Sequence, residues 1–547
     1  MSEGGLAIPG TTQILDEETV SFAAALIDRS GVADQAETAL ARRTGRPRAL
    51  PVRAVLAGLL LLAMDDRPLH LARVTDLLFR RLTPASRALL GVTGATPDQR
   101  AFLAACRRVR YCFRLTCSTA DPSPLPKNRC LTPQELTAAS RPMTPEQAEA
   151  ARNRLEILIN ALIEASIPVL DGSERAAFDG CTGLDATAVP LFSRGPSRRA
   201  GLSASDPDGG WYVREGDHRD AEDRKGKRRT RISRALEATI ATMAREPGTV
   251  PGHPNLALGL ALTRPGEDPG GTGARVLASA AARGHKAGSL GADRACTAAR
   301  SESFHLPARA PGYSPVMDYR TGQPGIQASS GGALLVEGTW CCPAMPAPLI
   351  DATAGHRSAA ITTDLYAARI ASRAPYRLKH KDGPDHDGYQ RLSCPATGNH
   401  PRLTCPLREA SLTPRDGRAK VPGAPADPPR ACRQAAITIA PGTGARHRQD
   451  LPFASPAWQD RYATLRNTIE GLNGYIKDPA REALAQPARR RVRGITPCAI
   501  FTALLLTAAN LRKIRAWRAL TAQQHTAAAA RRARRRRTSL RDHQPDP

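Results

Sequence analysis

Apolar residues recur at helical spacing in the first part of the chain. They do so in three stretches, residues 20–27, 52–62 and 69–78, which are separated by breaks at Gly45-Arg-Pro-Arg and Arg67-Pro. A spacing of three and four residues places such side chains on one helical face. Residues 18–120 are therefore predicted to be helical. A Pro- and Ser-rich loop follows at 118–128, and a further helix is predicted for 145–167.

The pattern changes to that of strands further along the chain. Strands are predicted for residues 181–192, 236–243, 256–262 and 286–292, of which 236–243 has the weakest pattern. In the third of these, leucine occupies every second position, as in a half-buried strand. A helix is predicted for 273–283, with Gly284 as its C-cap. The expected order is three strands, a helix and a fourth strand.

Acidic residues occupy particular places in this pattern. Asp185 lies within the first predicted strand, in Gly-Leu-Asp-Ala-Thr, and Asp293 ends the fourth, in Gly-Ala-Asp-Arg. Taken alone, either aspartate fits a turn or cap residue equally well. A third acid, Glu470, lies in the segment from Tyr462 to Lys477. If that segment is helical, its period places Arg466, Glu470, Asn473 and Lys477 on one stripe. The alternative is an amphipathic surface helix whose charges are only solvated.

This arrangement resembles the DDE transposases of bacterial insertion sequences, in the group marked by a Tyr–Arg–Glu–Lys signature. Arg466, Glu470 and Lys477 match that signature in type and spacing, whereas Tyr462 precedes Arg466 by four positions, one more than usual. The resemblance covers roughly residues 175–515. It implies an α/β fold with an RNase H-like catalytic core.

The resemblance also implies roles for these residues. Asp185, Asp293 and Glu470 would be the catalytic ligands of Mg²⁺ or Mn²⁺, and DNA would be contacted by Tyr462, Arg466, Asn473 and Lys477. The implied enzyme cleaves DNA at transposon ends and transfers the strand into target DNA. It would act as a homodimer or larger synaptic complex. Around residues 225–234 the chain departs from the family, because Lys and Arg crowd the start of the second strand; this indicates either a basic DNA-facing loop or a decayed copy.

We expect six parts along the chain. They are a helical domain that binds DNA ends (1–130), a linker and helix (131–172), the first part of the RNase H-like core (173–300), a strand-rich insertion with a cysteine cluster (301–450), the second part of the core with the glutamate helix (451–518), and a basic C-terminal tail (519–547). Residues 333–337 and 436–440 are predicted strands of the insertion. A helical dimerisation or packing domain is an equal alternative for the first part.

The insertion contains five of the twelve cysteines of the chain. Cys342, Cys394 and Cys405 each precede proline, and Cys432 follows. Four thiolates can hold a structural Zn²⁺ tetrahedrally, so Cys342, Cys394, Cys405 and Cys432 are the candidate ligands, with Cys341 as the substitute. The group contains no Cys-x-x-Cys pair, and buried free thiols are the alternative.

A formal net charge of +27 makes a polyanion the expected partner. A GC-rich genome also favours a composition rich in Ala, Arg, Gly and Pro. Two basic runs, 489–493 and 531–537, would add sequence-independent DNA affinity; the second is expected to be a disordered or fraying helical arm. The apolar stretches 55–64 and 498–509 are too short to span a membrane and are predicted core helices. With no signal peptide and few cysteines, we expect a cytoplasmic, nucleoid-associated bacterial protein.

Two other functions remain open from the sequence. One is a catalytically decayed transposase relic that only binds DNA, and the other is a zinc-ribbon DNA-binding regulator. Gly-x-x-x-x-Gly-Lys and Gly-x-Ser-x-Gly motifs are absent from the sequence, which disfavours nucleotide hydrolysis and esterase chemistry.

Overall fold

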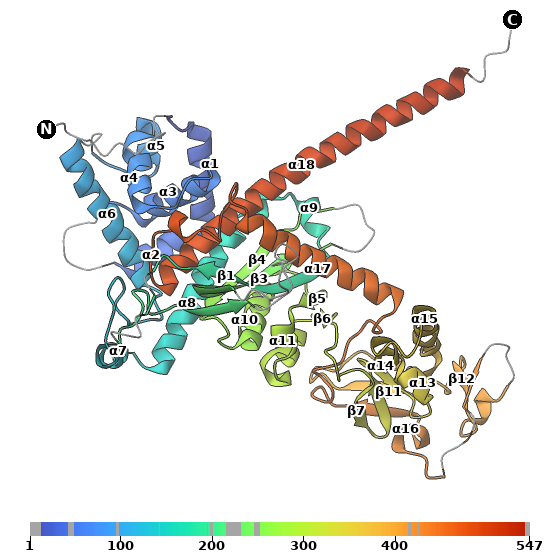
Figure 1. The fold of residues 1–547 in the computed structure, drawn as a ribbon. Coiled ribbons are helices and arrows are strands. Elements are labelled where there is room, and N and C mark those ends of the chain that lie inside the picture. Colours follow the sequence, from blue (N-terminus) through green and yellow to red (C-terminus); the bar gives the residue numbers. More distant parts are fainter. Residues whose placement is uncertain are drawn as a thin grey trace, which may run out of the picture.

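A central mixed sheet, surrounded by helices, organises the computed structural model (Figure 1). Three smaller sheets lie in a separate lobe formed by the segment between β6 and α17. The described residues are 13–41, 49–94, 98–141, 143–193, 195–196, 201–214, 231–245, 252–413, 418–421, 423 and 426–541. The fold is thus mixed α/β, as expected.

The central sheet has six strands: β1 (Thr182–Pro190), β2 (Gly210–Arg214), β3 (Arg231–Met243), β4 (Ala257–Thr263), β5 (Ser289–Ala292) and β6 (Ser314–Pro315). β1 is central, antiparallel to β3 on one side and parallel to β5 on the other. β4 pairs antiparallel with β3, and β6 pairs parallel with β5. Ala235 of β3 faces Pro190 of β1 and Gly210 of β2, so β2 extends the edge that β4 occupies. The order across the sheet is β4-β3-β1-β5-β6.

The predicted strands and helix of this region all form, with shifted ends. The helix is α10 (Pro269–Ala282). β2 was not predicted, because its five residues carry no clear alternation. Most of the basic stretch 225–234 lies outside the described residues. Its last residues, Arg231 to Arg234, are the first residues of β3 and do not belong to a loop.

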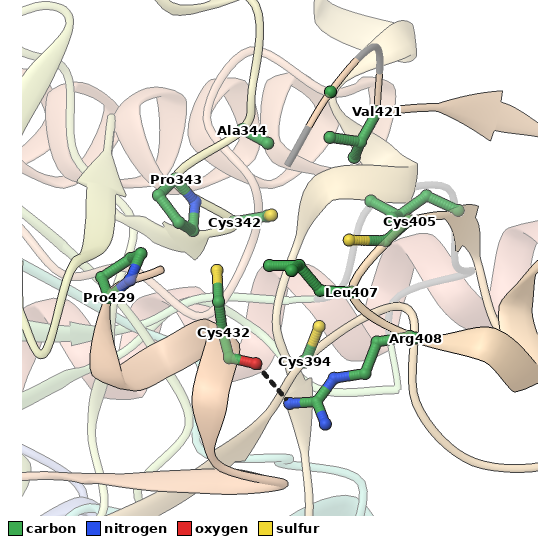
Figure 2. Close-up of a pocket in the computed structure, with 12 residues that line it drawn as sticks. Cys342, Pro343, Ala344, Cys394, Cys405, Leu407, Arg408, Val421, Pro429 and Cys432 are labelled. Carbon is green, nitrogen blue, oxygen red and sulfur yellow. Dashed lines mark hydrogen bonds between the residues drawn. The ribbon is translucent and has the colours of Figure 1, made fainter. Parts of the chain in front are cut away.

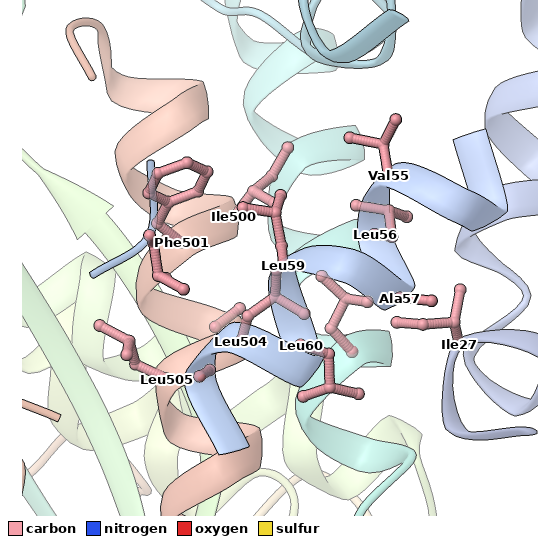
Figure 3. Packing of buried hydrophobic residues seen from close by; sticks show 14 of the residues in the cluster. Ile27, Val55, Leu56, Ala57, Leu59, Leu60, Ile500, Phe501, Leu504 and Leu505 are labelled. Carbon is pink, nitrogen blue, oxygen red and sulfur yellow. The ribbon is translucent and has the colours of Figure 1, made fainter. Parts of the chain in front are cut away.

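The region before the central sheet is formed by helices, one of which is very apolar. They are α1 (Glu17–Ser30), α2 (Val32–Ala39), α3 (Val52–Met64), α4 (Leu71–Arg80), α5 (Pro84–Leu89), α6 (Gln99–Ser118), α7 (Pro133–Ser140) and α8 (Pro145–Glu164). α3 is buried along almost its whole length. Figure 3 shows its leucines packed against Ile27 of α1 and against Ile500, Phe501 and Leu504. The same hydrophobic cluster includes residues of α8 and β4. The N-terminal helices therefore share one core with the central sheet.

The longest helix, α18 (Ile495–Arg541), joins these parts. Its first half packs against α3, α8 and β4. By length and hydropathy, residues 495–524 resemble a membrane span, but 83% of the most apolar window is buried inside the protein, as expected for a core helix. The second half projects away from the molecule (Figure 1), and the backbone of the basic run 531–537 continues as helix. Of the two forms expected for this run, the helical one is described.

The lobe between β6 and α17 is built from short elements. They are β7 (Ile326–Ser330), β8 (Ala333–Val336), β9 (Thr339–Cys341), α13 (Ala347–Ile350), α14 (Ala352–Arg357), α15 (Thr363–Ser372), β10 (Lys379–His380), β11 (Gln390–Ser393), β12 (Leu403–Thr404), β13 (Ala419–Lys420), α16 (Arg430–Arg433) and β14 (Ala436–Ile439). The two predicted strands of this region form as β8 and β14. Cysteines contribute to its hydrophobic core.

Two buried asparagines form hydrogen bonds with the backbone groups on the outer edge of β4. The Ala257 N–H donates to Asn510 Oδ1 (2.8 Å), and Asn510 Nδ2 donates to the Ala257 carbonyl (2.9 Å). Asn160 of α8 repeats this arrangement at Leu260, with distances of 2.8 and 3.1 Å. Unpaired backbone groups at a buried strand edge would be costly. The two side chains therefore replace the missing neighbouring strand and attach α8 and α18 to the sheet.

We predict that Asn160→Ala lowers the free energy of unfolding by about 2 kcal/mol or more, because each buried backbone group left without a partner costs about 1–3 kcal/mol. Urea unfolding measures the loss. Asn153→Ala, at an exposed position of the same helix, is the matched control and should change stability by no more than about 0.5 kcal/mol. Equal stability of the two variants would show that Asn160 does not satisfy this edge.

Candidate active site

The register of β1 and β5 brings two aspartates side by side. Gly183 pairs with Gly291 and Leu184 with Ala292, and the Asp293 N–H donates to the Leu184 carbonyl at 3.2 Å. The pairing thus continues to Asp185 and Asp293, on strands that lie about 4.8 Å apart. Residues two positions apart share a face of a sheet, so the glycine pair and the aspartate pair line the same face. Asp185 is half-buried and Asp293 is exposed.

Helix α17 (Pro456–Lys477) packs on this face. Its start is set by Ser455, whose side chain accepts from the Trp458 N–H, and by Pro456 at the first helical position. A Cβ added at Gly183 would lie 2.5 Å from Ile469 Cγ1, and one at Gly291 would lie 2.7 Å from Leu465 Cβ. Only glycine allows the helix to approach the two strands this closely.

The polar stripe of α17 emerges beside this contact. Asn473 Nδ2 donates to Asp185 Oδ2 at 2.5 Å. One turn earlier, Glu470 is 61% exposed and forms an ion pair with Arg466 at 3.0 Å. A hydrogen bond with Tyr462 raises the pKa of Arg466, and Glu470 adds to this rise. Tyr462 in turn stacks on Trp458, with ring centroids 4.7 Å apart.

The structure thus brings together part of the predicted site. Asp185, Asp293 and Asn473 converge, and Tyr462, Arg466 and Glu470 form a chain of contacts along α17. Lys477 is the last residue of the helix and is half-buried. In the described part of the chain, no group of three or more His, Cys, Asp or Glu side chains has the arrangement of a metal site. The carboxylate of Glu470 is directed to Arg466, and Asn473 contacts Asp185 in its place.

Two further ionisable groups lie near the aspartates. Burial, and next the carboxylates of Asp293 and Asp185, raise the pKa of the Cys296 thiol to about 12. Burial also raises the pKa of Glu237, and Asp293 adds to this shift. Neither residue was identified from the sequence, because no motif marks them. Glu237 thus adds another carboxyl group near Asp293, whereas the Cys296 thiol stays neutral.

The glycines were also missed, although a signal for them exists. Both aspartates end the same tripeptide pattern, Gly-Leu-Asp and Gly-Ala-Asp, and glycine within a strand often marks a close approach of another element. Gly471 and Gly474 of α17 behave differently. No described atom lies within 4 Å of a Cβ added at either position. Tight packing within the chain therefore does not explain them.

The basic run 489–493 has a structural role that the sequence did not reveal. Arg490 is only 3% exposed and donates to the carbonyl oxygens of Ala483 and Leu484 at 3.2 and 2.6 Å. Arg491 and Arg493 lie over the ring of Phe192 at 5.6 and 5.5 Å. For Arg490 the expectation of a DNA-binding residue is corrected, since its buried guanidinium group serves contacts within the protein. Arg491 remains exposed.

The four candidate zinc ligands lie around one cavity of the lobe between β6 and α17. Cys342, Cys394, Cys405 and Cys432 all line a space of about 440 Å³ (Figure 2). Two Cys-Pro segments turn sharply there: the Arg408 N–H donates to the Cys405 carbonyl, and the Thr397 N–H to the Cys394 carbonyl. Arg408 Nη2 also donates to the Cys432 carbonyl at 2.7 Å. Side chains distant in the sequence are thus held together.

The neighbouring Cys341 does not line this cavity. It ends β9, and its thiol is 3.4 Å from the Thr339 carbonyl. Burial raises the pKa of Cys342 to about 12, and Cys394, Cys432 and Cys405 contribute to the rise. The four thiols therefore influence one another electrostatically.

We predict that Gly291→Ala lowers the free energy of unfolding by about 1–3 kcal/mol, the usual cost of overpacking, because Leu465 Cβ leaves no room for a methyl group. Gly471→Ala on α17 is the control: it meets open space, and alanine is the better helix former by about 1 kcal/mol. It should be at least as stable as the parent protein in urea. A Gly291→Ala variant of parental stability would contradict the close packing of α17.

Comparisons with known proteins add no assignment: no family model, no curated protein and no solved structure matches the chain. The functional argument rests on the geometry of the residues described above.

Proposed function

We propose that this protein is a DDE transposase with an RNase H-like core. The order β4-β3-β1-β5-β6 supports this, with the first three strands antiparallel and the last two parallel to β1. The sequence resemblance implies an RNase H-like core with acids on the first and fourth strands and on a following helix; here Asp185 lies within β1, Asp293 directly follows β5 and Glu470 lies on α17. The segment between β6 and α17 corresponds to the insertion.

One observation carries the proposal. Asp185 and Asp293 lie in register on adjacent parallel strands, beneath a helix that carries Arg466, Glu470, Asn473 and Lys477 on one stripe. Oxygen donors are those that Mg²⁺ prefers. The two aspartates and the residues of the stripe are partly exposed and therefore accessible to DNA.

The reaction assigns a role to each residue. Asp185, Asp293 and Glu470 would hold divalent ions, whose contribution would be to activate water and to stabilise a leaving oxygen. Water forms a bond to the phosphorus at the transposon end, the bond to the 3′ oxygen breaks, and a 3′ hydroxyl is released. That hydroxyl then attacks a phosphorus of target DNA and displaces its 3′ oxygen. Asn473 orients Asp185, while Arg466 and Lys477 bind phosphate groups.

Glu470 has to leave Arg466 before it joins the aspartates. Their ion pair is exposed and joins residues four apart on a helix, and such pairs contribute only about 0.3–0.5 kcal/mol. A DNA phosphate can replace Glu470 as the partner of Arg466, which would free the carboxylate. Because two transposon ends must be joined, we propose a homodimer or a larger synaptic complex, acting on DNA in the bacterial cytoplasm.

A relic that binds DNA without cutting it is the second candidate. It is favoured by the contact of Asp185 with Asn473 where a carboxylate is expected, and by the pairing of Glu470 with Arg466. The two candidates differ in Mg²⁺-dependent cleavage and agree in DNA binding.

We predict that Asp185→Asn and Glu470→Gln each lower Mg²⁺-dependent cleavage about 1000-fold, because losing a metal ligand removes several kcal/mol of transition-state stabilisation. The substrate is labelled duplex DNA from each flank of the gene. Binding in gel shifts should be largely retained, since affinity is spread over many basic contacts.

Asp460→Asn is the matched control, because Asp460 is exposed on α17 but lies away from the polar stripe. It should cut like the parent protein. Cleavage at the parental rate by Asp185→Asn would overturn the proposal. Binding without cleavage by the parent, with Mg²⁺ or Mn²⁺, would identify the relic.

We also propose that the insertion binds a structural zinc ion. The residue types suit this metal, since four cysteines from separate segments line one cavity and Zn²⁺ prefers thiolate sulfur. In the described geometry the four thiols do not yet form a closed metal site, so binding would have to draw them together. Cys342, Cys394, Cys405 and Cys432 would hold the ion and link β9, β11, the turn after β12 and α16. A zinc-ribbon regulator would share this site, but it would have no use for the paired aspartates.

We predict about one zinc ion per chain by elemental analysis of the purified protein. Cys394→Ser and Cys405→Ser should each lose most of it, because a tetrahedral site needs all four ligands. Cys341→Ser is the control and should keep the metal, since that thiol does not line the cavity. A folded parent protein without zinc would refute the site and leave four buried free thiols.

A further inference from the structure

Helix α6 carries a face of exposed arginines. Arg100, Arg107, Arg110 and Arg114 are all exposed and follow one another at seven, three and four residues, so they lie on one side of the helix. Leu103 and Tyr111 lie on the same side and are 52% and 48% exposed. The Arg114 guanidinium lies over the Tyr111 ring, 5.4 Å from its centroid.

Among the described residues, no carboxylate neutralises this face. The sequence of α6 contains neither Asp nor Glu. Within the described part of the chain, none of the four arginines forms an ion pair, whereas exposed arginines elsewhere do, such as Arg129 with Glu135 and Arg391 with Asp382. Like charges three and four residues apart lower the stability of a helix. An external anionic partner would offset this repulsion.

The opposite face of α6 holds the helix rigidly in place. Val109, Cys112 and Phe113 are buried in the core shared with α3, and Arg80 of α4 lies over the Phe102 ring at 4.3 Å. The Asp98 side chain caps the first turn by accepting from the Ala101 N–H. The arginines are thus presented on a fixed scaffold.

We propose that this face of α6 binds duplex DNA, which names the DNA-contacting helix of the N-terminal region and rests on the proposed function. From Arg100 to Arg114 the helix rises about 21 Å, enough to follow several phosphates of one duplex, whose major groove admits a helix. Guanidinium groups bind phosphate oxygens in bidentate fashion. Tyr111 and Leu103 offer apolar contacts to sugars and base edges between them.

The test compares two triple variants of the full-length chain. Arg107→Gln/Arg110→Gln/Arg114→Gln removes three charges from α6 while keeping good helix formers. The control, Arg129→Gln/Arg152→Gln/Arg391→Gln, removes the same charge from arginines that already pair with carboxylates. Fluorescence anisotropy measures binding of both to a labelled duplex from the gene flank, between 50 and 200 mM salt.

We expect the α6 variant to bind more weakly and to show a salt slope smaller by about 2.7, at about 0.9 per phosphate contact. Between the two salt concentrations, the parent protein should then lose about 40-fold more affinity than the variant. The control variant should keep the parental slope.

Equal salt slopes for the two triple variants would overturn the inference, and so would stronger retention of the parent on anionic vesicles than on duplex DNA. Cleavage separates this inference from the proposed function. An α6 variant that binds like the control while the parent cuts DNA refutes only the role of α6. A parent that loses binding through α6 but never cuts refutes only the catalytic proposal.

Discussion

The candidate site depends on the close contact between α17 and two glycines. Gly183 and Gly291 face each other on β1 and β5, and the side chains of Ile469 and Leu465 occupy the space that any larger residue would need. Because both aspartates follow their glycine by two residues, the surface that accepts the helix also presents the carboxylates. The position of the polar stripe of α17 is therefore a consequence of packing.

The sheet beneath this contact is held by elements from both ends of the chain. α8 precedes the sheet in the sequence and α18 follows it, and each satisfies one residue of the β4 edge through a buried asparagine. The same two helices share the hydrophobic core of α3. The N-terminal helices and the sheet are thus connected through packed apolar side chains. Because of this shared packing, α6 has a fixed orientation relative to the sheet.

The large positive charge of the chain is divided between two uses. Some arginines are buried and serve the fold, as Arg490 does with backbone carbonyls and Arg373 does with Glu337 at 2.5 Å. Others, such as those on α6, are exposed and without acidic partners in the described part of the chain. Consecutive basic residues in the sequence do not show which role an arginine has. Most arginines of the run 489–493 contact other parts of the protein, whereas the exposed arginines of α6 are spaced along a helix without a long basic run.

Local patterning determined much of this protein. Period-2 alternation predicted β4, and helical spacing predicted α3. The apolar runs also placed Asp185 within the first strand and Asp293 at the end of the fourth. The helix of Glu470 was expected from the family resemblance. The Cys-Pro pairs marked three of the four cysteines that line one cavity, since such turns are local features. These properties depend on neighbours within a few residues, which the sequence displays directly.

Only the tertiary structure decided how these elements meet. The pairing of Gly183 with Gly291, the contact of Asn473 with Asp185, and the direction of Glu470 toward Arg466 depend on how α17 is seated across two strands, and a helical period cannot specify that rotation. The burial of Arg490 and the edge contacts of Asn160 and Asn510 join residues that are distant in the sequence or hidden by packing. Such contacts depend on many weak interactions across the whole core, so they cannot be predicted from any single segment of the sequence.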